Sequence, residues 1–443
     1  MKTINKKQTS MNRRQFLKYS ALSATSFAIG CAVNPVTGKM QLMLVSKDQE
    51  IQIDRQHSPH QFSADYGFIQ DKGIENYVNQ VGQKMAKNTH RTDMPYAFHC
   101  VNATYVNAYA FPGGSIATTR GILLRLENEA ELAALLGHEL GHVNARHTAE
   151  QLTSSQITSA IISGAAIFAQ SQDESYGALV SGLGALGSGL LLSKYSRDNE
   201  READALGMKY MVKTEYSPEG FIGLMDVLRN LSSHKPNLIE VMFASHPMSD
   251  ERYATAQKSL ETKYSSNKSF PIHREKYMDN TASLRAIQTT ISNVQNAEML
   301  IANKKFDDAE KALKTALRNS PSDYAALMIM SKCQLAQNKY SESRRYAQEA
   351  HQVYPQEPQS NHIQGMANIG LKQFDQAYHN FEQYEKLLPG NPNTIFFKGY
   401  SLENSGKKES AADAYTSFLK QVNQGEQAKH AYNRLVSWGY IKE

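Results

Sequence analysis

The sequence predicts an α+β, mostly helical domain in its first part, followed by an all-α solenoid of repeats. Three short runs rich in aromatic and small apolar residues, at 96–102, 107–111 and 115–123, read as strands among longer stretches with helical periodicity. A repeat of fixed length takes over near residue 290. The chain has 443 residues, 41% hydrophobic and 21% charged, which is ordinary globular composition.

The charge balance separates a leader from the rest of the chain. The net charge is +5, but residues 1–30 hold six basic side chains and no acidic one, so the remainder carries −1. The apparent basicity therefore belongs to the leader. No nucleic-acid partner is indicated for the folded part.

The leader combines two export motifs. "RRQFLK" (13–18) resembles a twin-arginine signal, and the apolar stretch 19–30 that follows is too short to span a bilayer. It ends at "AIGC", which resembles a lipoprotein box with Cys31 as the lipidated residue. We therefore expect a signal peptide at 1–30 and an exported, membrane-anchored lipoprotein that faces the periplasm, most simply from the outer membrane. The alternatives are a cleaved leader with Cys31 incidental, an uncleaved anchor, and a start at Met11.

The second half of the chain repeats every 34 residues. Four registers keep this step: Pro321, Pro355 and Pro389; Phe306, Tyr340, Phe374 and Lys408; Ala309, Ser343, Ala377 and Ala411; Ala297, Ser331, Gly365 and Gly399. This is the period of the tetratricopeptide repeat, a helix-turn-helix whose small residues let paired helices approach closely. We expect four repeats at about 290–423 and a final helix, 426–438, as a cap. A concave protein-binding surface is the expected function, and a plain helical spacer is the alternative.

The remaining segments set the domain boundaries. The polar stretch 263–280 contains a proline and predicts a linker, so we place a first domain at 31–262, a linker at 263–289 and the repeats at 290–443. Within the first domain, runs 157–169 and 177–192 are free of charge, and each is too short to span a bilayer. They are either closely packed buried helices or a hairpin that faces membrane or covers a substrate.

One helix contains a metal-binding pattern. "ENEAELAALLGHELGHVNARH" begins with a capping signal at Asn128 and carries an apolar stripe. His138 and His142 are four residues apart, so both imidazoles project from one face and can share a zinc ion. Glu139, one step round the helix, can reach a water at the metal without binding the metal itself. This is the H-E-x-x-H arrangement of zinc endopeptidases.

A zinc site of this kind needs a third protein ligand from another element. The segment "SRDNEREADALGMKYM" (196–211) predicts a helix with a buried apolar stripe. Glu200, Glu202 and Asp204 all flank that stripe. Helical geometry alone does not choose among them.

These motifs together resemble the zinc metalloendopeptidase family that includes HtpX, the CAAX prenyl proteases and BepA. The resemblance covers residues 40–260 approximately, and the leader and repeats make the chain most similar to the BepA-like periplasmic proteases with carboxy-terminal repeats. It implies a gluzincin-like zinc metalloprotease domain followed by an all-α tetratricopeptide-repeat solenoid. It also implies that Glu202, the first glutamate of "EAD", is the third zinc ligand. Membrane-embedded relatives carry transmembrane helices where the charge-free runs lie.

Two further stretches match the family. "NAYAFPGGSIATTRGIL" resembles the edge strand that pairs with substrate backbone, which gives Asn107 and Ala108 a substrate-binding role. "SHPMSDER" offers His246 and Arg252, the latter as a substrate contact. His246 either stabilises the oxyanion, occupies the metal as a fourth ligand, or simply caps a turn. Asp204 either orients a ligand imidazole or forms a structural ion pair.

The resemblance thus implies a zinc-dependent endopeptidase with one Zn²⁺ per chain and Glu139 as general base. Its expected substrates are misfolded or incompletely assembled envelope proteins, and its repeats are expected to hold these proteins or the outer-membrane assembly machinery. The alternative is a latent or chaperone-like binding protein whose zinc site is closed.

Overall fold

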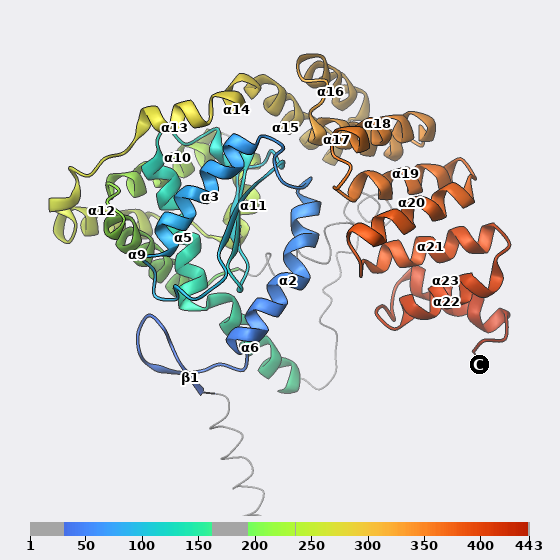
Figure 1. Ribbon diagram of the computed structural model, residues 1–443, viewed down its shortest axis with the longest axis horizontal. Coiled ribbons are helices and arrows are strands. Elements are labelled where there is room, and N and C mark those ends of the chain that lie inside the picture. Colours follow the sequence, from blue (N-terminus) through green and yellow to red (C-terminus); the bar gives the residue numbers. More distant parts are fainter. Residues whose placement is uncertain (1–30, 162–193, 235, 442–443) are drawn as a thin grey trace, which may run out of the picture.

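The computed structural model describes residues 31–161, 194–234 and 236–441. The leader and most of the two charge-free runs therefore lie outside the described residues. Among the described helices, none has the length and apolar character required to cross a bilayer. The amino-terminal domain (Figure 1) contains β1 (Cys31–Val33), β2 (Met40–Leu42), α2 (Lys47–Ala64), α3 (Lys72–Ala86), β3 (Ala97–Val101), β4 (Ala108–Ala110), β5 (Ser115–Thr119), α4 (Arg120–Leu123), α5 (Glu129–Ala145), α6 (His147–Ile161), α9 (Arg197–Lys213), α10 (Glu219–His234), α11 (Pro236–Ser245) and α12 (Asp250–Thr262).

Two small sheets account for the β structure of the described residues. β1 and β2 form an antiparallel hairpin, and the second sheet has the order β3-β5-β4. β3 runs parallel to β5, whereas β4 runs antiparallel to β5 and lies at the edge. All three strands of the second sheet were predicted. The run 115–123 is only half strand, because α4 begins at Arg120.

Helix α5 is the central element of this domain. All of its residues are buried, and it lies between α3, α9, α10 and β4. The side chain of Asn128 accepts a hydrogen bond from the backbone N–H of Glu131 (2.9 Å), so the predicted amino-terminal cap is confirmed. Arg146 ends the helix in the left-handed conformation, with φ of 65°. The chain then turns directly into α6.

Small residues bring α5 and α9 into backbone contact. A Cβ placed on Gly141 would lie 2.8 Å from Cα of Ala203, and one placed on Gly207 would lie 3.0 Å from the backbone nitrogen of His138. Real Cβ atoms essentially never show the first distance and only rarely the second, so a larger residue at either glycine would push the helices apart. This close approach holds the predicted metal-binding face of α5 against α9.

The segment 263–289, predicted as a linker, is instead folded against the amino-terminal domain. It forms η1 (Ser265–Asn267), α13 (Arg274–Asn280) and α14 (Ala282–Ala286). Tyr277 is fully buried and its hydroxyl donates to the carbonyl of Leu123 (2.6 Å), while Leu284 is 1% exposed. The segment is polar in composition because a few buried apolar side chains are enough to hold such short helices against the domain. This segment is therefore a packed part of the amino-terminal domain and does not have the structure of a linker.

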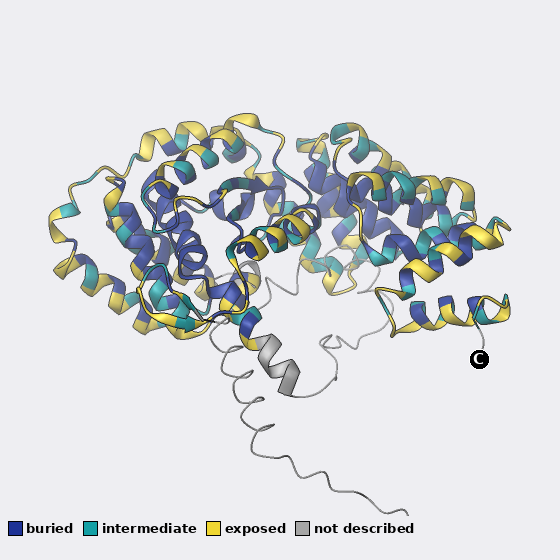
Figure 2. Ribbon diagram, turned by 60° about the horizontal axis from the view of Figure 1, so that its bottom comes forward, coloured by how far each residue is buried: buried dark blue, intermediate teal, exposed yellow. Residues whose placement is uncertain are grey.

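The repeats confirm the predicted solenoid. Phe306, Tyr340, Phe374 and Lys408 each begin the second helix of a repeat, and the small residues lie where paired helices meet: a Cβ on Gly365 would lie 2.7 Å from the ring of Phe381. Figure 2 shows buried residues on the inner sides of helices in both halves of the molecule. The helices are α15 (Gln288–Ala302), α16 (Phe306–Asn319), α17 (Tyr324–Ala336), α18 (Tyr340–Val353), α19 (Gln359–Gly370), α20 (Phe374–Leu387), α21 (Pro392–Asn404), α22 (Lys408–Leu419) and the capping α23 (Glu426–Ser437).

The repeats contact the amino-terminal domain through the last two residues of α2 and the turn that follows them. In this turn, counted as residues 63–67, Tyr66 and Gly67 have positive φ (66° and 71°). Ser63 donates to the buried carboxylate of Glu357, and the ammonium of Lys332 lies 4.5 Å from the ring centre of Tyr66. A Cβ on Gly67 would lie 2.7 Å from the side chain of Glu357, so only glycine fits there. These residues thus contact α15 through Glu298, α17 through Lys332 and α19 through Gln359, which are the first helices of three repeats.

A buried ion pair reinforces the same contact. Arg120, at the start of α4, binds Asp323 through two hydrogen bonds of 2.6 and 3.0 Å, and each side chain is 3% exposed. Asp323 is also the amino-terminal cap of α17. Removing one partner of such a pair leaves an uncompensated buried charge, at a cost of about 3–5 kcal/mol. The repeats and the amino-terminal domain therefore stabilise one another.

Candidate metal centre

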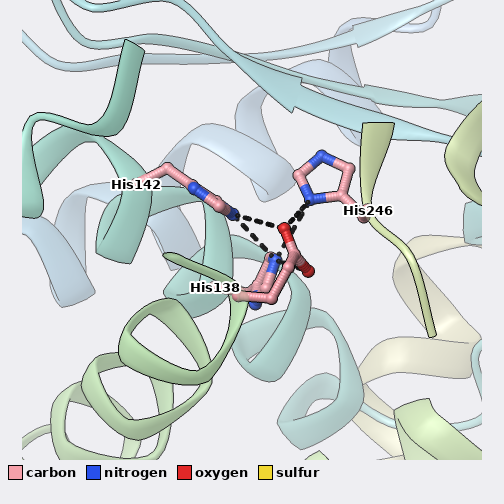
Figure 3. A group of neighbouring side chains, drawn as sticks. His138, His142 and His246 are labelled. Carbon is pink, nitrogen blue, oxygen red and sulfur yellow. Dashed lines mark hydrogen bonds and ion pairs between the residues drawn. The ribbon is translucent and has the colours of Figure 1, made fainter. Parts of the chain in front are cut away.

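Four side chains converge on one point between α5, α9 and the residue that follows α11. They are His138, His142, Glu200 and His246, whose candidate ligand atoms all lie within 4.8 Å of one another. Nε2 of His138 lies 3.1 Å from Nε2 of His142 and 3.3 Å from Nδ1 of His246. Oε1 of Glu200 lies 3.4 Å from Nε2 of His142 and 3.1 Å from Nδ1 of His246. Figure 3 shows the three histidines pointing toward this common centre.

These separations fit a four-coordinate metal ion. Ligand atoms placed 2.0–2.1 Å from the centre of a tetrahedron lie about 3.3 Å apart. The observed separations of 3.1 to 3.6 Å surround that value. All four residues are at most 5% exposed. A metal ion at this centre would also compensate for burying three imidazoles and a carboxylate in a dry site.

The third ligand predicted from the sequence was wrong. The structure brings Glu200, and not Glu202, to the two histidines of α5. The carboxylate of Glu202 lies 3.3 Å from Nε2 of His147, and its side chain is 31% exposed. Residues i and i+2 of a helix are separated by about 200° of rotation, so Glu200 and Glu202 cannot both face the same centre.

The small residues of α9 are the signal that distinguishes the two glutamates. Ala203 and Gly207 form the contact with α5. Gly207 is seven residues after Glu200, and two helical turns return to nearly the same direction. Glu200 therefore projects from the face that packs on α5, whereas Glu202 points to the side.

Arg252 and Asp204 lie directly behind the cluster. Asp204 contacts Nδ1 of His138 (2.9 Å), as its predicted orienting role requires, and binds the guanidinium of Arg252 through two hydrogen bonds of 2.7 Å. Arg252 also lies 2.6 Å from Oε2 of Glu200 and donates to the carbonyl of Pro247 (3.0 Å). It is 8% exposed. The predicted substrate contact of Arg252 is thus contradicted, because its donors are taken up by these partners.

Two residues that sequence reasoning missed support His142. Nδ1 of His147 lies 2.9 Å from Nδ1 of His142, so this imidazole fixes the orientation of a candidate ligand. The ring of Tyr195 stacks on His142 with ring centres 3.9 Å apart. His147 follows the H-E-x-x-H pattern by one helical turn plus a residue, which is a recognisable signal. Tyr195 carries none, because it depends on tertiary structure.

Glu139 lies beside the cluster without being part of it. It is 1% exposed, and its Oε1 lies 3.9 Å from Nε2 of His246 with no hydrogen-bond partner among the described residues. Burial raises the pKa of Glu139, and the charges of His246 and His138 offset part of that rise. A buried carboxylate with a free oxygen and a raised pKa has the character of a general base.

His246 occupies the position where a catalytic metal would accept water. It follows α11 directly, and its backbone N–H donates to the carbonyl of Met242 (2.7 Å). Its Nδ1 is one of the four converging atoms, and the residue is 5% exposed. Of the roles considered from sequence, this geometry fits the fourth ligand better than the oxyanion donor.

The expected substrate-binding residues lie on the edge strand. Asn107 precedes β4 and Ala108 begins it, and β4 packs against α5. Asn107 is 5% exposed and Ala108 is fully buried. The structure thus places them at the sheet edge that the resemblance implies, but in a covered state. Cys31, the predicted lipidation site, begins β1.

Comparison with known proteins agrees with this geometry. A model of peptidase family M48 matches residues 74–260, and a tetratricopeptide-repeat model matches residues 300–365. The chain is similar to the beta-barrel assembly-enhancing protease of Yersinia pestis, with 24% identity over 357 residues, which cover 75% of this chain and 73% of the relative. It is also similar to the metalloprotease YcaL of Escherichia coli K12, with 30% identity over 173 residues, 39% of this chain and 65% of that protein. All four converging side chains lie inside the region matched by the peptidase model.

Proposed function

We propose that this chain, a metalloendopeptidase that carries a peptidase family M48 domain and tetratricopeptide repeats, cleaves envelope proteins that are misfolded or incompletely assembled. The observation that carries the reaction type is the convergence of His138, His142 and Glu200 beside the buried carboxylate of Glu139. The substrate class is supported by the relatives named beta-barrel assembly-enhancing proteases.

Zinc is the metal that we assign to this cluster, because imidazole and carboxylate ligands in a compact tetrahedral arrangement suit Zn²⁺. When bound, zinc would polarise the scissile carbonyl and lower the pKa of water at the site. His138 and His142 would bind it through Nε2, with Asp204 and His147 holding the opposite ring nitrogens. Arg252 would keep Glu200 and Asp204 ionised and in place.

Glu139 would move the proton. Its Oε1, which has no hydrogen-bond partner among the described residues, would accept a proton from the attacking water and return it to the leaving amine. The edge strand β4, with Asn107 and Ala108, would bind an extended substrate segment as an additional strand. Backbone pairing of this kind requires an unfolded segment and depends little on the identity of its side chains. Both properties suit a protease for damaged proteins.

The repeats would select the partner, either the damaged substrate or the outer-membrane assembly machinery. The leader would place the enzyme: "RRQFLK" and "AIGC" support export through a twin-arginine signal and a lipid anchor at Cys31 on the periplasmic side of the outer membrane.

The function is tested by metal-dependent digestion of an unfolded protein. The purified full chain is expected to cleave casein and an unfolded β-barrel protein, to lose this activity with 1,10-phenanthroline, and to regain it with added Zn²⁺. The folded form of the same barrel serves as the control and should survive. If the zinc-loaded chain and its His246→Ala variant both leave unfolded proteins intact, the proposal is wrong.

One observation favours a latent form of this enzyme, in which the metal site is closed to water. Four protein atoms surround the candidate metal position, which leaves no open site for water. Tyr195 and the cluster itself are buried. An open hollow of about 370 Å³ lies between residues 194–197 and 247–249, next to His246, and would give the loop that carries His246 room to move.

His246→Ala is accordingly expected to raise basal proteolysis. Removing the fourth ligand opens a coordination position, and a tenfold rise would correspond to a closed form favoured by about 1.4 kcal/mol. Initial rates on casein, with metal content measured in parallel, test this. His379→Ala, which changes an exposed histidine of α20, is the control. A fall in turnover of about 10²–10³ would point instead to an oxyanion donor at His246.

A further inference from the structure

The hairpin β1–β2 and the residues after it expose an unusual amount of apolar surface. Val33 (57% exposed), Met40 (64%), Leu42 (42%) and Leu44 (43%) fall within twelve residues. They are four of the ten large apolar side chains that are exposed in the described part of the chain, so the concentration is local. We call these four residues the hairpin face. Scattered exposed apolar residues are ordinary, whereas a contiguous group marks a contact surface.

Strand alternation explains why these residues share one side. Met43 and Val45 are buried against α6, and the backbone N–H of Leu44 donates to the hydroxyl of Thr153 (3.1 Å). Because successive side chains in a strand alternate, Met40, Leu42 and Leu44 point away from α6. The antiparallel register sets Val33 opposite Met40 and Cys31 opposite Leu42. The face is therefore a property of the hairpin fold and not of one mobile side chain.

The hairpin has its own structural support. Asn34 accepts hydrogen bonds from the backbone N–H groups of Val36 (2.8 Å) and Thr37 (3.0 Å), and Gly38 completes the turn with φ of 69°. The exposed cation Lys39 follows immediately. An apolar face with a lysine at its border matches the interface of a bilayer, where apolar side chains enter the acyl boundary and ammonium groups reach the phosphates.

We propose that the hairpin face lies in the interfacial region of the membrane, beside the anchor. The inference rests on the proposed lipid anchor at Cys31, which is the first residue of β1, so the face begins where the tether ends. The apolar stretch 19–30, the last part of the predicted signal peptide, ends directly before it. A tether at this point would hold the hairpin at the bilayer surface, and burying the apolar area there removes it from water.

This contact would orient the active site. The inner side of the hairpin packs on Thr153 of α6, and α6 begins at His147, which contacts the candidate ligand His142. Six residues of helix separate the two contacts, a rise of about 9 Å. The metal centre would therefore be held at a fixed, short height above the membrane, where unassembled membrane proteins are exposed.

Fluorescence quenching by brominated phospholipids tests the contact. The full chain with Trp438→Phe, which removes the one tryptophan, receives either Leu42→Trp or the matched control Leu387→Trp. The two leucines are equally exposed, at 42% and 44%. After reconstitution into phosphatidylethanolamine–phosphatidylglycerol vesicles, we expect brominated acyl chains to quench the Leu42→Trp signal about twofold or more, since an interfacial face enters the acyl boundary. Aqueous iodide should quench only the control.

Each other outcome overturns the proposal. Quenching of Leu42→Trp by iodide alone would show that the face remains in water. Quenching by neither reagent would show that protein covers it, either another part of this chain or a second copy. Vesicle flotation tests the lipid anchor separately from the hairpin contact. A chain that floats with the vesicles but whose Leu42→Trp signal is not quenched by lipid contradicts the hairpin contact alone. A chain that does not float contradicts both the anchor and the hairpin contact. Proteolytic activity does not enter the readout.

Discussion

Glu200→Ala is expected to remove the metal ion and all proteolysis, while Glu202→Ala retains both. The carboxylate of Glu200 lies 3.1 to 3.6 Å from nitrogen atoms of His138, His142 and His246, so it would hold the metal ion together with them. The carboxylate of Glu202 instead pairs with His147, at 3.3 Å. Loss of a supporting residue costs about 10–100-fold in metal affinity, and loss of a direct ligand should cost more.

Both variants change a glutamate of the same helix to alanine, so effects on helix propensity cancel. Metal content after dialysis is the primary measurement, with casein digestion and circular dichroism alongside. Glu200→Ala also leaves Arg252 without one carboxylate partner, and the spectrum will show whether the fold survives. Equal metal content in the two variants would contradict the assignment of Glu200, and not Glu202, as the third ligand.

Glu139→Gln is expected to keep the metal and lower turnover by about 10²–10⁴-fold, the range typical of a general acid–base residue. The amide has the same shape as the carboxylate but cannot accept a proton. Glu139 contributes no atom to the converging set, so metal binding should not change.

A latent site would hide this effect, so the change is best measured in the His246→Ala background. Single-turnover cleavage of casein, with zinc content held equal, gives the ratio. Glu150→Gln, on the exposed side of α6, is the control for loss of a negative charge near the site. A Glu139→Gln enzyme with unchanged turnover would require another base, and His147 would become the next candidate.

Much of the fold follows from local patterns in the sequence. The 34-residue registers locate the helices of the repeats because small residues and turn residues must recur wherever helices pair. The H-E-x-x-H helix follows from its cap at Asn128 and its apolar stripe. The segment 263–289 shows the limit of composition: Tyr277 and Leu284 anchor it through contacts with partners far away in sequence.

The site was harder to predict wherever a role depends on tertiary contacts. A triplet motif suggested Glu202, whereas the close packing of Gly207 and Ala203 on α5 favours Glu200. Arg252 has the chemistry of a substrate contact, but burial next to Asp204 gives it a supporting role. In both cases the sequence shows which type of residue is present, but not the direction in which its side chain points.

The turn at residues 63–67 has a consequence for how the repeats can choose a partner. This turn already occupies the first helices of three repeats, with Ser63 on Glu357 and Tyr66 beside Lys332. A tethered segment competes at an effective concentration of millimolar order. A protein present at micromolar concentration would therefore need roughly a thousandfold tighter affinity than the turn to displace it. Helices α21 to α23 lie further along the solenoid, away from this turn (Figure 1), so a foreign chain that binds to them would not have to displace the turn.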